Sequence, residues 1–89
     1  MSAHKQTKRV MDRLARIQGH VGAIKEMVEK DRPCPEVLTQ MAAVRAAMDK
    51  AARLLLAYHI EHCLMDSQRG EDAQAKLREL REALDRYLK

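Results

Sequence analysis

The sequence predicts an all-α fold, with a three-helix protomer whose second helix is the longest. The apolar residues are mostly Ala, Leu, Val, Ile and Met, with only two aromatic residues in 89, a composition typical of helices. Three glycines and two prolines are too few for a small β-sandwich or barrel, which reverses direction about every 8–12 residues. Apolar residues also recur every three or four positions, as on one face of a helix. At this length, residues 1–89 are predicted to form a single domain.

The first predicted helix covers residues 4–30. Its apolar residues form one stripe, namely Val10, Leu14, Ile17, Val21, Ile24 and Met27 or Val28. Gly19 and Gly22 interrupt this helix, and each costs about 1 kcal/mol relative to alanine. We expect a neighbouring helix to approach closely at these glycines; otherwise they are weak points of the helix.

A short corner at residues 31–36 separates the first helix from the second. Pro33 removes a helical donor, and the residue before each proline is pushed toward extended geometry. Pro35 suits the first position of a new helix, which makes Cys34 the expected N-cap. The second helix then runs over residues 35–66 without another Pro or Gly. Its apolar stripe is Leu38, Met41, Val44, Met48, Ala51, Leu55 and Tyr58.

The length of the second helix predicts an oligomer. Thirty residues of helix span roughly 45 Å, whereas a compact chain of this size has a radius of gyration of about 12 Å. One chain therefore cannot cover the stripe, and a second copy must bury it across a two-fold axis, as an antiparallel helical bundle. A polar link at residues 67–70 leads to a third, shorter helix, whose apolar residues are Leu77, Leu80, Leu84 and Tyr87 or Leu88.

The positive charge is concentrated in the first third of the chain. The net charge is +4, and residues 1–30 hold seven basic and three acidic side chains. This asymmetry suggests an acidic partner, although a solvated helix face with a basic bias gives the same count. The chain has no apolar stretch of about 20 residues and no secretory signal, so we expect a cytoplasmic protein without a membrane partner.

Two cysteines and a histidine are spaced as metal ligands of an antiparallel dimer. His59 and Cys63 are four apart and share one face of the second helix. Cys34 is 29 residues before Cys63, roughly 43 Å along a helix, so the two thiols cannot meet within one chain. An antiparallel pair of second helices with its dyad near Met48 brings Cys34 of one chain beside His59 and Cys63 of the other.

This ligand set has a recognisable metal preference. Two thiolates and one imidazole suit Cu(I) or Zn(II), and an added nitrogen ligand suits Ni(II). His62 points about 100° away from Cys63 and is a weaker candidate. His4, near the N-terminus, is a possible extra ligand, and His20 is a weak one. Ordinary packing of these residues is the competing interpretation, and the mirrored position of Cys34 favours the metal site.

These residues lie in motifs that resemble the copper-sensitive operon repressor family, CsoR/RcnR. The motifs are RLARIQGHVGAI at residues 13–24, Cys34-Pro35, QMAAVRAAMD at residues 40–49, and the pair His59 and Cys63. The resemblance covers almost the whole chain. It implies an all-helical dimer of dimers, a homotetramer, that binds operator DNA when metal-free and releases it when the effector binds.

The resemblance also implies roles for particular residues. Cys34, His59 and Cys63 would be the Cu(I) ligands, and Glu79 would hydrogen-bond the ligand imidazole and so fix its orientation. Pro33 stands where the family often has Tyr, which puts any role of that Tyr in doubt. The DNA-contacting residues map onto Arg13 and onto Lys50, where Arg is more usual. Plausible companions on that surface are Lys8, Arg9, Arg16 and Arg53.

The preferred interpretation is a Cu(I)-responsive repressor of transcription that binds double-stranded operator DNA through its phosphates and its shape. Repressors of the same family that sense Ni(II) or Co(II), persulfide or formaldehyde are the alternatives. A zinc hydrolase with a Cys₂His site is a different class, but no convincing general base is in reach, so we do not expect an enzyme. A metal chaperone or store does not account for the basic first helix.

Overall fold

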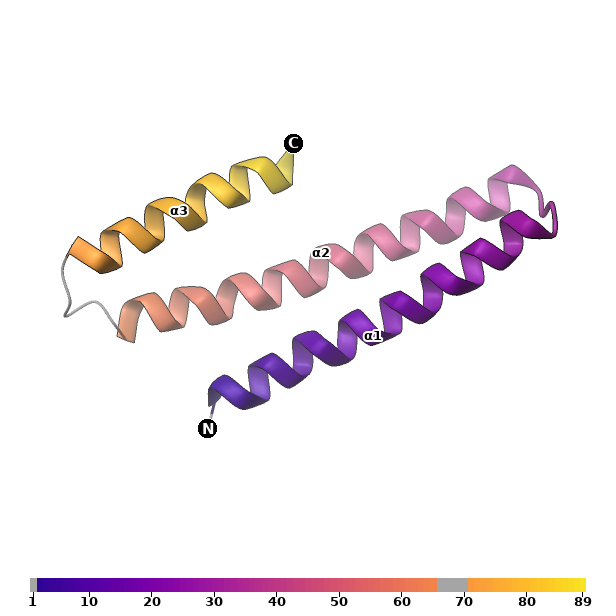
Figure 1. The fold of residues 1–89 in the computed structure, drawn as a ribbon. Coiled ribbons are helices and arrows are strands. Elements are labelled where there is room, and N and C mark those ends of the chain that lie inside the picture. Colours follow the sequence, from indigo (N-terminus) through magenta and orange to yellow (C-terminus); the bar gives the residue numbers. More distant parts are fainter. Residues whose placement is uncertain (1, 66–70) are drawn as a thin grey trace. The chain divides into compact units, whose positions relative to one another are not determined.

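The structure, a computed structural model, describes residues 2–65 and 71–89. These residues form three helices, α1 (Ser2–Glu29), α2 (Cys34–Met65) and α3 (Glu71–Leu88), and no strand (Figure 1). The predicted all-α fold is confirmed, and the first two helices begin and end within two residues of their predicted bounds. The predicted link at residues 67–70 lies outside the described residues. The chain divides into two compact units, residues 1–55 and 56–89.

The first unit is an antiparallel helical hairpin. Helix α1 runs back along the part of α2 that precedes residue 56 (Figure 1). Val10, Ile17 and Ile24 of α1 are buried and are seven residues apart, and Ala51 of α2 is 3% exposed. This spacing keeps a straight line of side chains facing a neighbouring helix. We call this contact line the seam; its half-buried members are His20 and Met27 on α1 and Val37, Gln40, Val44, Ala47 and Leu54 on α2.

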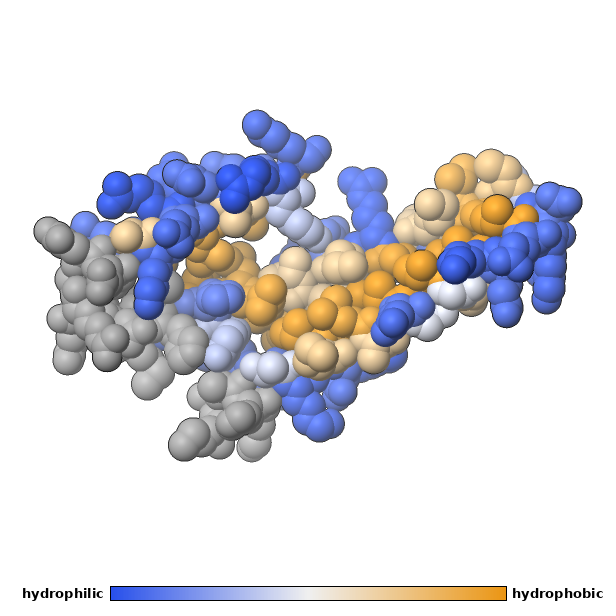
Figure 2. All heavy atoms as spheres, in the orientation of Figure 1, coloured by the Kyte–Doolittle hydropathy of each residue, from blue (hydrophilic) through white to orange (hydrophobic). Residues whose placement is uncertain are grey.

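The apolar stripe predicted on each of α1 and α2 divides into two sets of residues. One set packs in the seam, and the other is exposed. Leu14, Val21 and Val28 of α1 are exposed, as are Met41, Met48 and Leu55 of α2. We call these six residues the open apolar face. On each helix they follow a seam position by one residue. In an antiparallel pair, such positions on both helices lie on the same flank of the seam. Figure 2 shows apolar side chains gathered in a continuous band along the hairpin.

The corner between α1 and α2 corrects the predicted helix cap. The Pro33 carbonyl accepts hydrogen bonds from the backbone N–H groups of Glu36 (3.0 Å) and Val37 (3.2 Å). Pro33 is therefore the N-cap residue and Cys34 is the first helical residue. The prediction that Cys34 is the N-cap is wrong by one position. The cap is made by the backbone carbonyl of Pro33 alone, so the type of side chain does not identify the capping residue in the sequence. An Arg32–Glu36 ion pair of 2.9 Å joins the corner to the first turn of α2.

The two glycines of α1 do not mark a close helix approach within the chain. A Cβ atom added at Gly19 or Gly22 would have no atom within 4 Å apart from its own helix backbone. The expected approach of a neighbouring helix is therefore wrong for this chain taken alone. Both glycines weaken α1 without a packing gain inside the subunit.

The second unit contains the end of α2 and all of α3. Leu80 and Leu84 of α3 are half-buried and four residues apart, whereas Leu77, Tyr87 and Leu88 are exposed. Helix α3 therefore has the apolar stripe that its sequence predicts. Among the described helices, none is long and apolar enough to cross a membrane.

Candidate nucleic-acid interface and metal ligands

Three arginines of α1 lie on one flank of the hairpin. Arg9 and Arg16 each directly precede a buried seam residue, and the exposed Arg13 lies seven residues before the half-buried His20. With Asp12 and Leu54 they line an open hollow of about 420 Å³. Helical spacing places this flank opposite the open apolar face, because Arg9 and Arg16 precede seam positions whereas Leu14 and Val21 follow them. The basic and apolar residues of α1 are thus separated on the two sides of the seam.

Among the described residues, no carboxylate neutralises the positive charge of the three arginines. Asp12, the acid among the described residues that line the hollow, is 3.4 Å from the Nζ atom of Lys8. Of the described side chains, none forms an ion pair with Arg9, Arg13 or Arg16. An uncompensated cationic patch of this kind attracts phosphate, whose binding releases condensed counterions from nucleic acid.

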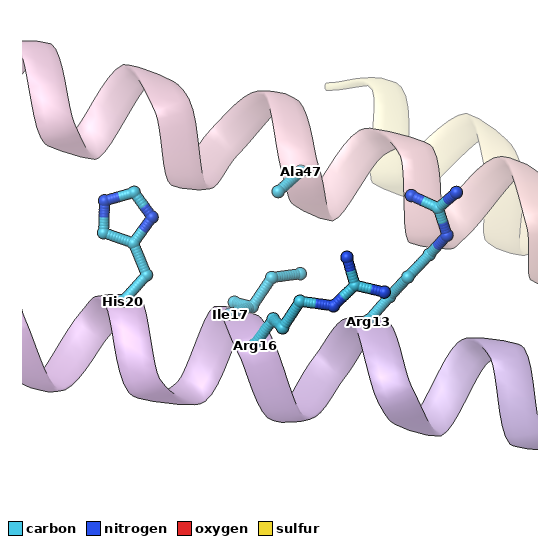
Figure 3. A pocket seen from close by; sticks show the side chains of 5 residues that line it. All are labelled: Arg13, Arg16, Ile17, His20 and Ala47. Atoms are coloured by element: carbon cyan, nitrogen blue, oxygen red, sulfur yellow. The ribbon is translucent and has the colours of Figure 1, made fainter.

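A smaller cavity opens beside the seam. It has a volume of about 130 Å³ and is lined by Arg13, Arg16, Ile17, His20 and Ala47. Figure 3 shows the four α1 side chains pointing toward α2, where Ala47 faces them. The cavity exists because the small Ala47 side chain fills little of the seam opposite two long arginines.

His20 is a functional candidate that the sequence analysis underrated. Its Nε2 atom is 2.8 Å from Oε1 of Gln40, across the hairpin, and this hydrogen bond is partly buried. His20 follows Arg13 by seven residues and Ile17 by three, a spacing that indicates a seam position. That signal was present in the sequence, but the Gln40 partner depends on the register of α2 against α1.

The other predicted DNA-contacting residues are distributed unevenly. Lys50 and Arg53 are exposed and three apart on α2. Lys50 precedes the buried Ala51, so it lies on the same flank of the seam as Arg16, and Arg53 lies further out on that side. Lys8 lies on the face of α1 away from the seam, where it pairs with Asp12. The structure therefore brings Arg9, Arg13 and Arg16 together and leaves Lys8 apart from them.

The predicted metal ligands lie at opposite ends of α2. Cys34 is its first residue and is an exposed, free thiol. His59, in the last two turns, is also exposed, and its ring centroid is 5.7 Å from that of Tyr58. The side chains of His4, His62 and Cys63 lie outside the described residues. Where side chains are described, no three His, Cys, Asp or Glu residues come together to hold a metal.

These donors nevertheless fit a soft metal ion shared between two chains. Cys34 is the first residue of a long helix, so its free thiol lies at the helix end, where a second chain can reach it. Both Cys34 and His59 are open to solvent and therefore accessible to a ligand from another copy. Glu79, the expected partner of the ligand imidazole, is exposed on α3.

The three-helix fold, the basic flank of α1 and the soft donors at the two ends of α2 define the class as an all-helical, metal-responsive regulator. Residues 6–86 match the family described as metal-sensitive transcriptional repressors, and the chain belongs to that family. The resemblance inferred from the sequence motifs is thus confirmed. The members of this family are transcriptional repressors rather than enzymes.

One relative and two solved structures support this assignment. The chain is 38% identical to the copper-sensing transcriptional repressor CsoR of Bacillus subtilis, over 97% of this chain and 88% of the relative. The structure of the copper-sensing repressor CsoR with Cu(I) from Geobacillus thermodenitrificans NG80-2 matches with a TM-score of 0.84 and 33% identity, over 96% and 88% of the two chains. The nickel-responsive transcriptional regulator InrS matches with a TM-score of 0.74 and 46% identity, over 90% of each chain.

Proposed function

We propose that this protein is a Cu(I)-responsive repressor whose metal-free form binds operator DNA and whose Cu(I)-bound form releases it. The observation that carries the proposal is the exposure of two soft donors, Cys34 and His59, at opposite ends of one long helix. The similarity to CsoR repressors from two organisms supports the choice of copper. Residues 1–89 act together as one cytoplasmic DNA-binding and metal-sensing domain.

Cu(I) is held between two subunits in this proposal. Cys34 of one protomer and His59 and Cys63 of its partner supply two thiolates and one imidazole, a set that suits Cu(I) and also accommodates Zn(II). The metal supplies a strong link between the two chains. Glu79 accepts a hydrogen bond from the second ring nitrogen of His59, which fixes the tautomer and the direction of the ligating lone pair.

The open apolar face supports a homodimer. Its six residues are exposed and share one flank of the seam by their helical spacing, and Figure 2 shows an apolar band along the hairpin. Full burial of a Val, Leu or Met side chain contributes about 1.5–3 kcal/mol, so covering this face with a second copy favours association strongly. Two such dimers assemble into the homotetramer that the family resemblance implies.

DNA is bound by the basic flank. Arg13 and Lys50 contact backbone phosphates, with Arg9 and Arg16 beside Arg13 and with Arg53 beside Lys50. Lys8 lies apart from this surface, on the face of α1 away from the seam, and contributes less because Asp12 offsets its charge. Each neutralised phosphate contributes about 0.9 to the slope of log K against log salt, so binding weakens steeply as salt rises. Metal binding biases the tetramer toward a form whose basic flanks no longer match the duplex.

The test is fluorescence anisotropy of the protein on a DNA fragment from upstream of its own gene. The fragment is titrated with metal-free protein, and the complex is then titrated with Cu(I), Ni(II), Zn(II) or a persulfide donor. We expect binding without metal and release by Cu(I) at a stoichiometry of one ion per subunit. Absence of DNA binding at low salt contradicts the proposal.

Replacement of the bridging thiol separates sensing from DNA binding. Cys34→Ala is expected to bind the DNA fragment with unchanged affinity, because Cys34 is remote in sequence from the basic residues of α1. Release by Cu(I) should be lost, because the remaining His59 and Cys63 come from a single chain. Glu36→Gln is the matched control, since it alters the same helical turn without removing a ligand. Equal release from Cys34→Ala and the unchanged protein contradicts the proposed site.

Ni(II) is the second candidate effector. The nickel-responsive regulator InrS is 46% identical to this chain, compared with 33% for the Cu(I)-bound CsoR. A nickel site needs a fourth ligand, for which His4 is the candidate near the N-terminus. X-ray absorption of the loaded protein distinguishes a three-coordinate copper site from a four-coordinate nickel site.

A further inference from the structure

Two charged residues interrupt the apolar surface of α2. Arg45 and Asp49 are exposed and four residues apart, so they share one face of the helix. Arg45 follows the half-buried Val44 by one residue, and Asp49 directly follows Met48, which places both beside the open apolar face. The ion pairs recorded among the described side chains do not include Arg45. A charge in an apolar contact is costly unless an opposite charge meets it, so this surface fits a partner that presents both signs.

The proposed metal ligands lie on the same face of α2 as these two charges. Positions 59 and 63 follow Arg45 and Asp49 by fourteen residues each, which is two heptad repeats, so helical spacing keeps all four positions on one face. A partner helix that brings Cys34 beside positions 59 and 63 therefore also covers Arg45 and Asp49. This step rests on the proposed function, because the intersubunit metal site defines which face the partner covers.

The same site defines which positions of the two helices lie opposite each other. Residue 34 of one helix lies opposite residue 61 of the other, midway between positions 59 and 63, so the numbers of opposite residues add up to 95. Asp49 of one copy then lies opposite position 46 of the second copy, one residue or about 1.5 Å along the axis from its Arg45. Packed helix axes are about 8–10 Å apart, a gap that an arginine side chain can bridge. The two-fold axis repeats the contact, with one pair on each side of Met48.

The apolar side chains alone do not select this alignment. Met41, Met48 and Leu55 repeat every seven residues, so sliding one helix by seven residues, about 10.5 Å, brings members of the set into contact again. After such a slide Asp49 is at least six residues, or about 9 Å along the axis, from Arg45 of the second copy. A parallel arrangement instead places like charges side by side, which is unfavourable. Of these alignments, the one that assembles the metal ligands is the one that pairs the opposite charges.

We propose that Arg45 of one copy forms an ion pair with Asp49 of the second copy, twice in each dimer, and that these pairs select the alignment of the two α2 helices. The partner that this surface fits is a second copy of the chain, since that copy supplies the complementary charge at each position. Arg45 and Asp49 are positioning residues for the metal site. Buried ion pairs add little net affinity but penalise alignments that leave a charge unpaired.

Charge reversal tests the pairing in the full-length, metal-free protein. Arg45→Asp places carboxylates opposite each other in its homodimer, and Asp49→Arg places guanidinium groups opposite each other. We expect each variant alone to associate at least about tenfold more weakly in sedimentation equilibrium, because like charges meet in the contact. An equimolar mixture of the two variants should regain the association of the unchanged protein, since each acidic side chain of one variant meets an arginine of the other. The double variant Arg45→Asp/Asp49→Arg should regain it within a single sequence.

A matched control separates pairing from the change in net charge. Glu26→Arg adds the same charge as Asp49→Arg at an exposed position, on the side of α1 away from the seam. Alone it should associate like the unchanged protein, and it should rescue Arg45→Asp less well than Asp49→Arg does, because one contact still joins two carboxylates. Full association of either single reversal, or equal rescue by Glu26→Arg, overturns the proposal. Where a single reversal also loses its helical circular dichroism, the mixture and the double variant decide: failure of both to restore association overturns the pairing.

Removal of both charges tests the role in alignment. Arg45→Met/Asp49→Leu leaves an apolar face that no longer favours one alignment over a seven-residue slide. We expect it to associate as tightly as the unchanged protein, because apolar residues can replace a buried ion pair without loss of stability, and to bind Cu(I) several-fold more weakly. Unchanged Cu(I) affinity contradicts the role of the pair in alignment.

These outcomes are distinguishable from those of the proposed function. If association follows the charge rule but Cu(I) does not release DNA, the repressor function fails and the charge pair stands. If Cu(I) releases DNA but the charge reversals leave association unchanged, the charge pair is wrong and the repressor function stands.

Discussion

Asp31 is the residue at which α1 stops. Its backbone φ of 53° is in the left-handed region, and the N–H groups of Asp31 and Arg32 return to the carbonyls of Val28 (3.1 Å) and Met27 (3.0 Å). This is the Schellman pattern, in which glycine is the usual residue at the left-handed position. The chain carries a residue with a Cβ there and accepts some strain.

Replacing Asp31 by glycine should stabilise the protein by about 0.5–1 kcal/mol. Relief of the left-handed strain contributes about 1–2 kcal/mol, and the greater flexibility of glycine in the unfolded chain removes about 0.5–1 kcal/mol of that gain. Urea unfolding followed by circular dichroism measures the change, at equal protein concentrations because unfolding is coupled to any dissociation. Lys30→Gly, which adds the flexibility without relieving strain, should be less stable than the unchanged protein. A decrease for both variants contradicts the argument.

The N-cap of α2 was predicted one residue away from its actual position. Pro33 and Pro35 identified the boundary of α2 because proline restricts its own φ and the conformation of its predecessor. They did not identify which residue caps it, since the Pro33 carbonyl performs that role with its backbone alone. Likewise, the sequence predicts that His20 lies in a helix. Its hydrogen bond to Gln40 could not be predicted, because it depends on the register of α2 against α1.

The helices as elements were predictable, and their inward faces were not. Both Val10–Ile17–Ile24 and Leu14–Val21–Val28 repeat every seven residues in α1, so periodicity alone does not decide which set faces α2. The structure buries the first set and exposes the second. The choice depends on how α2 packs against α1, where small residues such as Ala47 and Ala51 occupy the seam. This packing depends on both helices together, so the apolar pattern of one helix alone does not predict it.

Helix α1 should become more stable when Gly22 is replaced by alanine. A Cβ at this position meets open space, and alanine is favoured over glycine in a helix interior by about 1 kcal/mol. Thermal unfolding of Gly22→Ala should therefore show a higher midpoint. Ala23→Gly, the reverse change at the exposed neighbouring position, should lower it by a similar amount. Lower stability of Gly22→Ala, with Ala23→Gly behaving as expected, would place another chain against this glycine in the assembled protein.

The molecule as a whole separates two kinds of surface on one hairpin. The basic flank with Arg9 and Arg16 lies on one side of the seam, and the open apolar face lies on the other. A continuous apolar band of this kind on a small protein marks an interaction surface, and a cationic flank marks a surface for an acidic partner. In the proposed dimer, a second copy covers the apolar face and leaves the arginines accessible for the proposed contact with DNA. The proposed assembly and the proposed DNA binding can therefore be altered independently.

A charge placed in the open apolar face should dissociate the assembly without unfolding the hairpin. Met48 is 39% exposed in one chain and lies at the predicted dyad, so two copies of Met48→Glu would bring like charges together in an apolar contact, which is strongly unfavourable. Light scattering coupled to size-exclusion chromatography is expected to show a species of lower mass than the unchanged protein. Ala15→Glu, an exposed position on the far side of α1 from the seam, should keep the original mass. Because the proposed Cu(I) site takes a thiol and an imidazole from different chains, Met48→Glu should also lose tight copper binding, whereas Ala15→Glu keeps it. Full copper affinity in a single-chain species would mean that one subunit completes the site alone, contrary to the intersubunit arrangement.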